Sequence, residues 1–177
     1  RTTEEVRAFV GNGARRLMER AVPPEVTGGD FEAVLTEYRD WYQAHNCVAT
    51  APYPGIPALL AALAEAGIKT AVVSNKPDAT TKTLAARFFP GLPAFGQRDD
   101  VPPKPAPDLV FRALETLGVD AADAIYVGDS EVDVATARNA GLPLAAVSWG
   151  FRGRRALAEA GAAVIVDTAA ELLEVLR

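Results

Sequence analysis

The sequence is poor in residues that catalyse through sulfur or imidazole. It has one cysteine, Cys47, and one histidine, His45, among 177 residues. A single cysteine excludes an intrachain disulfide and favours a reducing, cytoplasmic setting. A thiol nucleophile would have only that histidine as its base, and the two lie two positions apart at the predicted end of one helix. This spacing does not favour a catalytic pair.

Long apolar runs and an excess of positive charge are also absent. No window approaches the roughly 18 uninterrupted apolar residues that a membrane span needs. The formal net charge is −5, which argues against general binding to nucleic acid or to an anionic membrane surface. With 49% hydrophobic and 23% charged residues, the composition is that of a globular protein with a sizeable core. We expect neither nucleic acid nor a membrane as a partner, but a small-molecule substrate, and a monomer or homodimer.

Residues 1–51 are predicted to be helical. Thr2 and Glu5 have the spacing of a capping box, and the helix that they start is interrupted by the glycines of residues 11–13. A second helix is predicted over residues 14–22, and Asp30 is the expected N-cap of a third. One face of this third helix is apolar and aromatic, which indicates packing against a core or an interface, although a ligand role is also open. The face comprises Phe31, Val34, Leu35, Tyr38, Trp41, Tyr42 and His45.

From residue 52 onwards, predicted helices and strands alternate. The boundary lies at Ala51-Pro52-Tyr53-Pro54-Gly55, where prolines and a glycine indicate a loop between the two parts. Alternation of this kind predicts an α/β fold with a doubly wound, mostly parallel sheet, whose ligands bind beyond the carboxyl ends of the strands. The expected helices cover residues 56–67, 80–88, 107–118, 132–139 and the last turns of the chain, and the expected strands cover residues 68–73, 94–96, 124–127, 144–147 and 163–166.

Three polar clusters coincide with predicted strand ends or with the loops that follow. In the first, Ser74, Asn75 and Lys76 come directly after a buried strand. A hydroxyl and the backbone amides beyond it are good donors to a phosphoryl oxygen at the start of a helix. Serine and asparagine are equally ordinary residues of turns and helix caps, so this cluster alone leaves both interpretations open.

The second cluster is a single lysine between prolines, in the stretch PPKPAPD. Prolines on both sides of Lys104 hold a long, flexible side chain on a stiff extended loop, which places its charge at a low entropic cost. The alternative is a solvated lysine in a proline-rich connector. We favour the functional interpretation.

The third cluster, VGDSEVD, is the most specific. Gly128 allows a tight exit from a strand and places Asp129 at its carboxyl end, where a hard cation could bind. Asp133 lies four residues further on, one helical turn along and on the same face. An N-capping aspartate with a solvated partner is the simpler alternative, but the order strand, glycine, aspartate, helix favours a metal site.

Together these clusters resemble the haloacid dehalogenase superfamily of Mg²⁺-dependent phosphatases. Ser74 matches the second motif of that family, Lys104 the third, and Asp129 with Asp133 the fourth. The stretches YPGIPALLAALAEAGIKTAVVSNKP, VGDSEVDVATARNAG and VSWGFRG are similar to the phosphoglycolate phosphatase branch. The resemblance implies that residues 1–51 form a helical cap, residues 52–177 form the α/β core, and Asp129 is a ligand of Mg²⁺.

The resemblance also identifies a missing part. In that family the nucleophile and the general acid/base are the two aspartates of a D-x-D pair that ends a central strand before the cap. Asp99 and Asp100 are adjacent and follow no apolar strand, and Asp167 has alanine at position 169. We therefore expect this sequence to be a piece of a longer enzyme, inactive by itself, with a gap between the strands that lead to Ser74 and Asp129.

The expected function is hydrolysis of a small phosphorylated metabolite, with 2-phosphoglycolate as the family default. Ser74, Lys104, Asp129 and Asp133 are the expected catalytic residues. Substrate contacts are expected from Asn75 and Lys76 of the core and from Gly13 and Arg15 of the cap. A phosphomutase, a phosphatase for sugar phosphates or nucleotides, and a non-catalytic binding or regulatory protein of the same fold remain alternatives.

Overall fold

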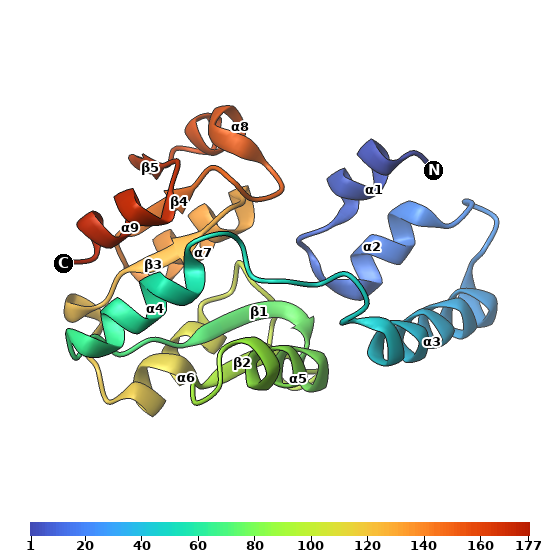
Figure 1. Cartoon of the computed structure of the whole chain (residues 1–177). Helices are drawn as coiled ribbons and strands as arrows, with labels where there is room; N and C mark the ends of the chain where they lie inside the picture. The colour runs from blue at the N-terminus through green and yellow to red at the C-terminus, as the bar shows by residue number, and fades with distance from the viewer.

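The structure is a computed structural model that describes residues 1–177. Helices α1 to α3 lie to one side of the strands and of the remaining helices, and an extended connection after α3 leads to α4 (Figure 1). We call residues 1–51 the helical segment and residues 52–177 the α/β segment. None of the helices is long and apolar enough to serve as a membrane span.

The helical segment consists of α1 (Thr3–Phe9), α2 (Gly13–Ala21) and α3 (Gly28–His45). The predicted capping box is confirmed, because the Thr2 side chain accepts from Glu5 N and the Glu5 carboxylate accepts from Thr2 N at 2.6 Å. The N-cap of α3 is Thr27, so the prediction of Asp30 was wrong by three positions, and Asp30 lies in the first helical turn. There its carboxylate faces the positive end of the helix dipole.

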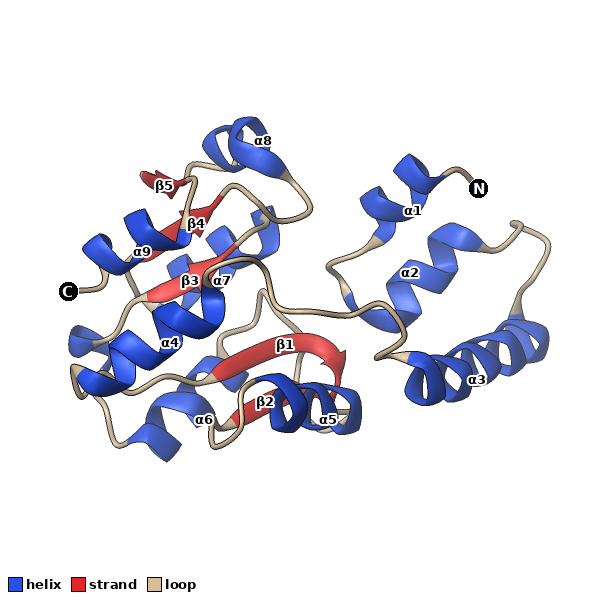
Figure 2. Cartoon of the chain, viewed as in Figure 1, coloured by secondary structure: helices blue, strands red, loops and turns tan.

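The strands of the α/β segment form two separate parallel groups (Figure 2). The first contains β1 (Val72–Pro77) and β2 (Ala94–Gln97), and the second contains β3 (Tyr126–Gly128), β4 (Leu144–Val147) and β5 (Val164–Val166). The predicted gap is present, because β1 and β3 are not hydrogen-bonded to each other and no strand lies between them. A groove of about 720 Å³ separates them, lined by Val73, Tyr126 and Val127 and by apolar residues of α4 and α6.

Helices cover both faces of the β3–β4–β5 group, as predicted for a doubly wound sheet. On one face, Ala145 and Val147 pack with residues of α4 and α9, and on the other, Ala146 packs with Val134 and Leu157. Ala145, Ala146 and Leu157 are completely buried. The helices of this segment are α4 (Ile56–Glu65), α5 (Asp78–Phe88), α6 (Asp108–Leu117), α7 (Glu131–Ala140), α8 (Gly153–Glu159) and α9 (Ala169–Val175), with a 3-10 turn, η1 (Ala121–Asp123).

Candidate active site

The centre of the site is a buried ion pair between Lys104 and Asp133. Lys104 Nζ donates to Asp133 Oδ1 at 2.7 Å, to the Tyr126 hydroxyl at 3.1 Å and to the Val73 carbonyl at 3.4 Å. An ammonium group has three N–H donors, so every donor of Lys104 has a protein partner. Because Val73 belongs to β1 and Tyr126 to β3, the lysine bridges the two strand groups.

Asp133 is held by more than its lysine. Its Oδ2 accepts from Asp129 N and Ser130 N at 3.1 Å and from Ser130 Oγ at 2.7 Å, while Asp133 N donates back to Ser130 Oγ. Ser130 is thus the N-cap of α7, and Asp133 completes the capping box. The same carboxylate therefore starts the helix, fixes the backbone at Asp129 and orients Lys104.

Burial disfavours the charged forms of Lys104 and Asp133, but the attraction between the two groups outweighs this effect. Burial by itself would raise the pKa of Asp133, but the Lys104 charge and the hydrogen bonds from Lys104 and Ser130 hold it below its usual range. Burial would likewise lower the pKa of Lys104, yet Tyr126 and Asp133 raise it overall. Burial also raises the pKa of Tyr126 to about 12. At neutral pH the lysine and the aspartate are both charged and the tyrosine keeps its proton.

Asp129 stands at the carboxyl end of β3, as predicted, and a loop from β4 fixes it. Phe151 N donates to Asp129 Oδ2 at 2.8 Å. Gly150 lies so close to this carboxylate that a Cβ there would collide with it, and a Cβ at Gly128 would collide with the Asp133 side chain. Neither glycine has a positive φ, so both positions require glycine for space rather than for backbone conformation.

Ser74 and Asn75 lie inside β1 rather than after it, because the strand begins at Val72 and continues to Pro77 with a register shift against β2. Ser74 follows Val73 directly, and its Oγ accepts from Lys76 N at 3.1 Å. Asn75 is buried and uses its amide group fully: Nδ2 donates to the Gly11 and Lys104 carbonyls at 3.0 Å, and Oδ1 accepts from Lys104 N at 2.8 Å. Asn75 therefore anchors the backbone of the lysine loop and of the helical segment.

Lys76 is the second cation of this edge. No hydrogen bond of its ammonium to a protein group is found, and burial lowers its pKa while the nearby Asp129 carboxylate opposes that effect. A half-buried ammonium group without a partner, close to Asp129 and Lys104, is suited to meeting an anion.

The helical segment reaches this edge at the turn before α2. Asn75 binds the Gly11 carbonyl, and Gly13 packs against the Asn75 carbonyl and the Gln97 side chain. Arg15 lies in the first turn of α2, where it forms a two-fold ion pair with Glu32 at 2.9 and 2.8 Å and lies over the Phe31 ring. Gly13 is thus at the boundary of the two segments, while the Arg15 guanidinium is committed to a carboxylate of α3.

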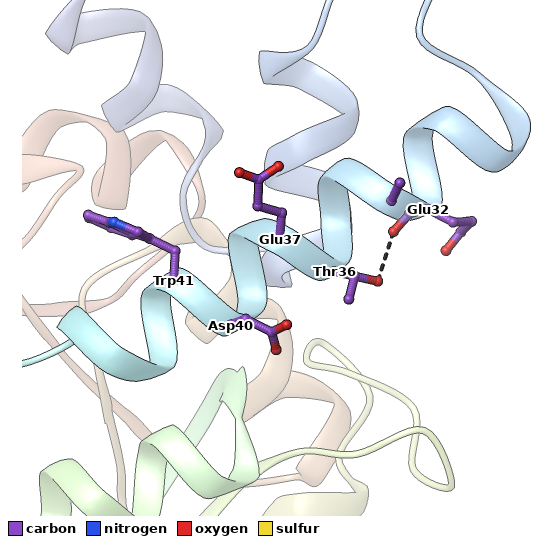
Figure 3. A pocket seen from close by; sticks show the side chains of 6 residues that line it. Glu32, Thr36, Glu37, Asp40 and Trp41 are labelled. Atoms are coloured by element: carbon purple, nitrogen blue, oxygen red, sulfur yellow. Dashed lines mark hydrogen bonds between the residues drawn. The ribbon is translucent and has the colours of Figure 1, made fainter.

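A second hollow is lined only by side chains of α3 (Figure 3). It is lined by Glu32, Glu37 and Asp40, together with Trp41, whose side chain is exposed although the sequence predicted packing for it. Arg15 neutralises the Glu32 carboxylate, and the remaining carboxylates of Glu37 and Asp40 repel a phosphorylated anion. The hollow is therefore not a candidate for the phosphate site.

Two residues that touch the site were not identified from the sequence. Tyr126 links Lys104 and Asp133 through its hydroxyl, which donates to Asp133 Oδ1 at 3.2 Å. Arg152 contacts the helical segment from the loop that holds Asp129. A tyrosine in a short apolar strand is an ordinary core residue, and only its closeness to VGD was a signal. The arginine belongs to the stretch VSWGFRG, which resembles the phosphoglycolate phosphatase branch but contains no local signal for the role of Arg152.

The carboxylates do not gather into a ready-made metal cage. No group of three or more histidine, cysteine or acidic side chains could hold an ion in this structure. Asp133 is saturated by Lys104, Ser130 and backbone amides, which leaves Asp129 as the one acidic side chain of this edge that can offer an oxygen to a cation.

Comparison with known proteins identifies the family of the chain. The family model for haloacid dehalogenase-like hydrolases matches residues 1–141. N-acetylmuramic acid 6-phosphate phosphatase of Pseudomonas aeruginosa is 34% identical over 182 residues, which cover 98% of this chain and 78% of that enzyme. A phosphoglycolate phosphatase of Pseudomonas savastanoi pv. phaseolicola is 33% identical over 96% of this chain, and the match spans 65% of the length of that enzyme.

A crystal structure gives the same result for the fold. A chain from Lactobacillus delbrueckii subsp. bulgaricus, assigned as a phosphoglycolate phosphatase, superposes with a TM-score of 0.92 at 35% identity. The match covers 99% of this chain and 83% of that one. The protein described here belongs to the haloacid dehalogenase-like hydrolase family.

Proposed function

We propose that this chain is the larger part of a Mg²⁺-dependent phosphatase that hydrolyses a small phosphorylated acid through a phosphoaspartate. The observation that carries the proposal is the buried Lys104–Asp133 pair, joined through a backbone amide to Asp129 at the carboxyl edge of the strands. Fixed charges at such an edge stabilise the negative charge that develops on a transferring phosphoryl group. The names of the relatives support the same reaction class.

Each residue has a defined part in this proposal. The Ser74 hydroxyl donates to a phosphoryl oxygen, and the Lys104 ammonium neutralises the phosphoryl charge. To do so, Lys104 exchanges its longest contact, the 3.4 Å hydrogen bond to the Val73 carbonyl, for the substrate. Asp133 keeps Lys104 charged and oriented. Lys76 supplies a second positive charge at the site of the anionic substrate.

Asp129 is the proposed ligand of Mg²⁺. A hard cation takes carboxylate and water oxygens, and Mg²⁺ is commonly bound through only one or two carboxylates, so a single fixed aspartate fits part of such a site. Bound Mg²⁺ supplies charge neutralisation at the phosphoryl oxygens. The remaining protein oxygen is proposed to come from the nucleophile strand.

We place the nucleophile on a strand outside these 177 residues, seated between β1 and β3. Support comes from the edges of β1 and β3, neither of which pairs with a strand on this side, and from the apolar groove of about 720 Å³ between them. A parallel strand there would pair with both edges and end beside Ser74 and Asp129. Its aspartate would attack phosphorus, the substrate oxygen would leave with a proton, and water would then release phosphate.

The substrate is proposed to carry a carboxylate as well as a phosphate. Both 2-phosphoglycolate and N-acetylmuramic acid 6-phosphate have this combination, and relatives named for each match more than nine-tenths of this chain. The helical segment acts as the cap over the site, with Gly13 at the boundary. Asn75 and Arg15 would contact the substrate only by giving up present partners, so Lys76 is the favoured carboxylate ligand. N-acetylmuramic acid 6-phosphate is the second candidate substrate, because the enzyme named for it matches 98% of this chain.

The test measures release of inorganic phosphate from 2-phosphoglycolate and N-acetylmuramic acid 6-phosphate, with and without Mg²⁺. The chain of 177 residues is compared with the enzyme that includes the proposed nucleophile strand. We expect turnover only from the longer form. Lys104→Ala and Asp129→Ala should each lower its kcat by roughly 10²–10³-fold, the usual cost of losing one stabiliser of transition-state charge.

Lys82→Ala is the matched control, because Lys82 is exposed and paired only with Asp78 on the surface of α5. It should leave kcat within about twofold. Robust turnover by the 177-residue chain would contradict the need for an external nucleophile, and phosphate binding without turnover by the longer form would favour a non-catalytic binding protein.

A further inference from the structure

The side chain of Arg152 hydrogen-bonds to both segments of the molecule. Its Nη1 donates to the Arg7 carbonyl at 2.9 Å and its Nη2 to the Val10 carbonyl at 2.7 Å, both at the end of α1. On the other side, Nε and Nη2 bind the Glu131 carboxylate at 2.8 and 3.3 Å. Only 14% of the arginine side chain is exposed, which is unusual for a residue of a surface loop.

The end of α1 is suited to a cation. The last carbonyls of a helix have no intrahelical partner, and they carry the negative end of the helix dipole. Val10 is the C-cap of α1 and has an extended backbone, so its carbonyl turns away from the helix. The planar guanidinium offers several donors in a fixed fork, which allows one side chain to hold two carbonyls and a carboxylate together.

We infer that Arg152 is a positioning residue that holds the helical segment closed over the carboxyl edge of the strands. Glu131 fixes the guanidinium from the first turn of α7, two residues after Asp129, so the closed position of the helical segment is set against the same helix that carries Asp133. Asn75 provides the only other side-chain hydrogen bond from the α/β segment to residues 7–13, through the Gly11 carbonyl.

Asp129 does not depend on the guanidinium. The hydrogen bond to its Oδ2 comes from the backbone of Phe151, and Gly150 packs against the carboxylate through its backbone. Removing the Arg152 head group therefore loosens the helical segment and leaves the strand-edge residues in place. Arg152 thus contributes to the fraction of molecules that are closed, together with the hydrogen bonds of Asn75 to the Gly11 carbonyl and of Thr80 to the Gln43 side chain.

The kinetic consequence rests on the proposed phosphatase function. If substrate binds productively only to the closed form, its apparent affinity falls in proportion to the closed fraction. In the enzyme with the nucleophile strand, Arg152→Ala should raise KM about tenfold and leave kcat within about twofold. A merely structural role would instead lower kcat through loss of active protein, with KM unchanged.

A second readout needs neither metal nor turnover. Hydrogen–deuterium exchange of the 177-residue chain is compared for the wild type, Arg152→Ala and Arg155→Ala. Arg155 is the control, since it lies three positions on, is 93% exposed and pairs only with Glu159. We expect exchange in residues 3–21 to rise about tenfold or more in Arg152→Ala alone, because charge-assisted hydrogen bonds to both carbonyls are lost. Exchange in α7 and β4 should not change.

Glu131→Gln keeps the inference testable if Arg152→Ala disturbs the whole fold. It retains the arginine and removes the charge that orients it, so a smaller rise confined to residues 3–21 is expected. Exchange equal to the wild type in both variants would overturn the inference. If neither substrate is hydrolysed by the longer enzyme, the proposed function fails while the exchange result still decides the role of Arg152.

Discussion

The helical segment and the α/β segment are stabilised in different ways. In residues 1–51 the buried apolar side chains are Phe31 and Leu35, and neither α1 nor α2 has a buried residue. The α/β segment contains three apolar clusters and the buried Lys104 network. Capping boxes and exposed ion pairs such as Arg15–Glu32 contribute little compared with apolar burial. The helical segment is therefore the part that can move, and its position depends on a few contacts with its neighbour.

The largest effect should come from breaking the buried ion pair of the α/β segment, for which the helical segment has no counterpart. Lys104→Met leaves the Asp133 charge buried without its partner and should lower the free energy of unfolding by about 3–5 kcal/mol. Arg155→Met breaks an exposed pair and should cost at most about 0.5 kcal/mol. Urea unfolding followed by circular dichroism measures both. Equal effects of the two substitutions would contradict the importance assigned to the buried pair.

The difference in unfolding free energy between the wild type and Lys104→Met should depend on pH. The folded-state pKa of Asp133 is lowered, so its contribution is present above the unfolded value of about 3.9 and is lost as the pH falls through the folded value. The pKa of Lys104 is raised, so its contribution is complete below about 10.4 and is lost only as the pH rises through the higher folded value. The stability gap between wild type and Lys104→Met should therefore be widest from about pH 5 to 10 and narrow in acid.

A matched pair of leucines compares the two cores directly. Leu157 is completely buried in the α/β segment, and Leu35 is 1% exposed in the helical segment. Leu157→Ala should lower the free energy of the main unfolding transition by about 2–5 kcal/mol. Leu35→Ala should leave that transition within about 1 kcal/mol and instead speed hydrogen exchange in residues 13–45. Equal loss of the main transition in both variants would mean that the segments unfold as one cooperative unit.

The smallest effect concerns one hydroxyl group. Tyr126→Phe keeps the ring in its apolar cluster and removes the oxygen shared by Lys104 and Asp133. The direct Lys104–Asp133 contact remains, so the loss should be about 1 kcal/mol of unfolding free energy. Tyr53→Phe, at an exposed position, is the control. No loss in Tyr126→Phe would show that the hydroxyl is not part of the network.

The sequence predicted those elements whose signals are local. Strand β4 has the predicted bounds, and the helices predicted over residues 107–118 and 132–139 end at the left-handed glycines Gly118 and Gly141. Helix α8 was not predicted because Leu157 is its one buried side chain, which gives no periodic apolar stripe. Strand β1 was placed four residues early, since its polar second half looks like a turn and is extended only because it pairs with β2.

The residues of the candidate site likewise fall into two groups, those with a local sequence signal and those without one. Lys104, Asp129 and Asp133 stand out because proline, glycine and a strand end surround them in the sequence. The partners of Asn75 lie 64 and 29 residues away, and those of Arg152 lie 145 and 142 residues away. No local pattern encodes such contacts. The sequence therefore identified the residues expected to carry charge at the site, but the residues that hold them in place emerged from the tertiary structure.

The close approach of Gly128 and Gly150 to the two carboxylates has a consequence for mutational screens. Alanine at either position adds one methyl group, changes no charge and meets no forbidden backbone angle, yet it must displace Asp133 or Asp129. A saturation screen scored by phosphate release from the longer enzyme should therefore find these two glycines as intolerant as the charged residues beside them. Gly128→Ala and Gly150→Ala would therefore displace a site carboxylate without altering the net charge of the site.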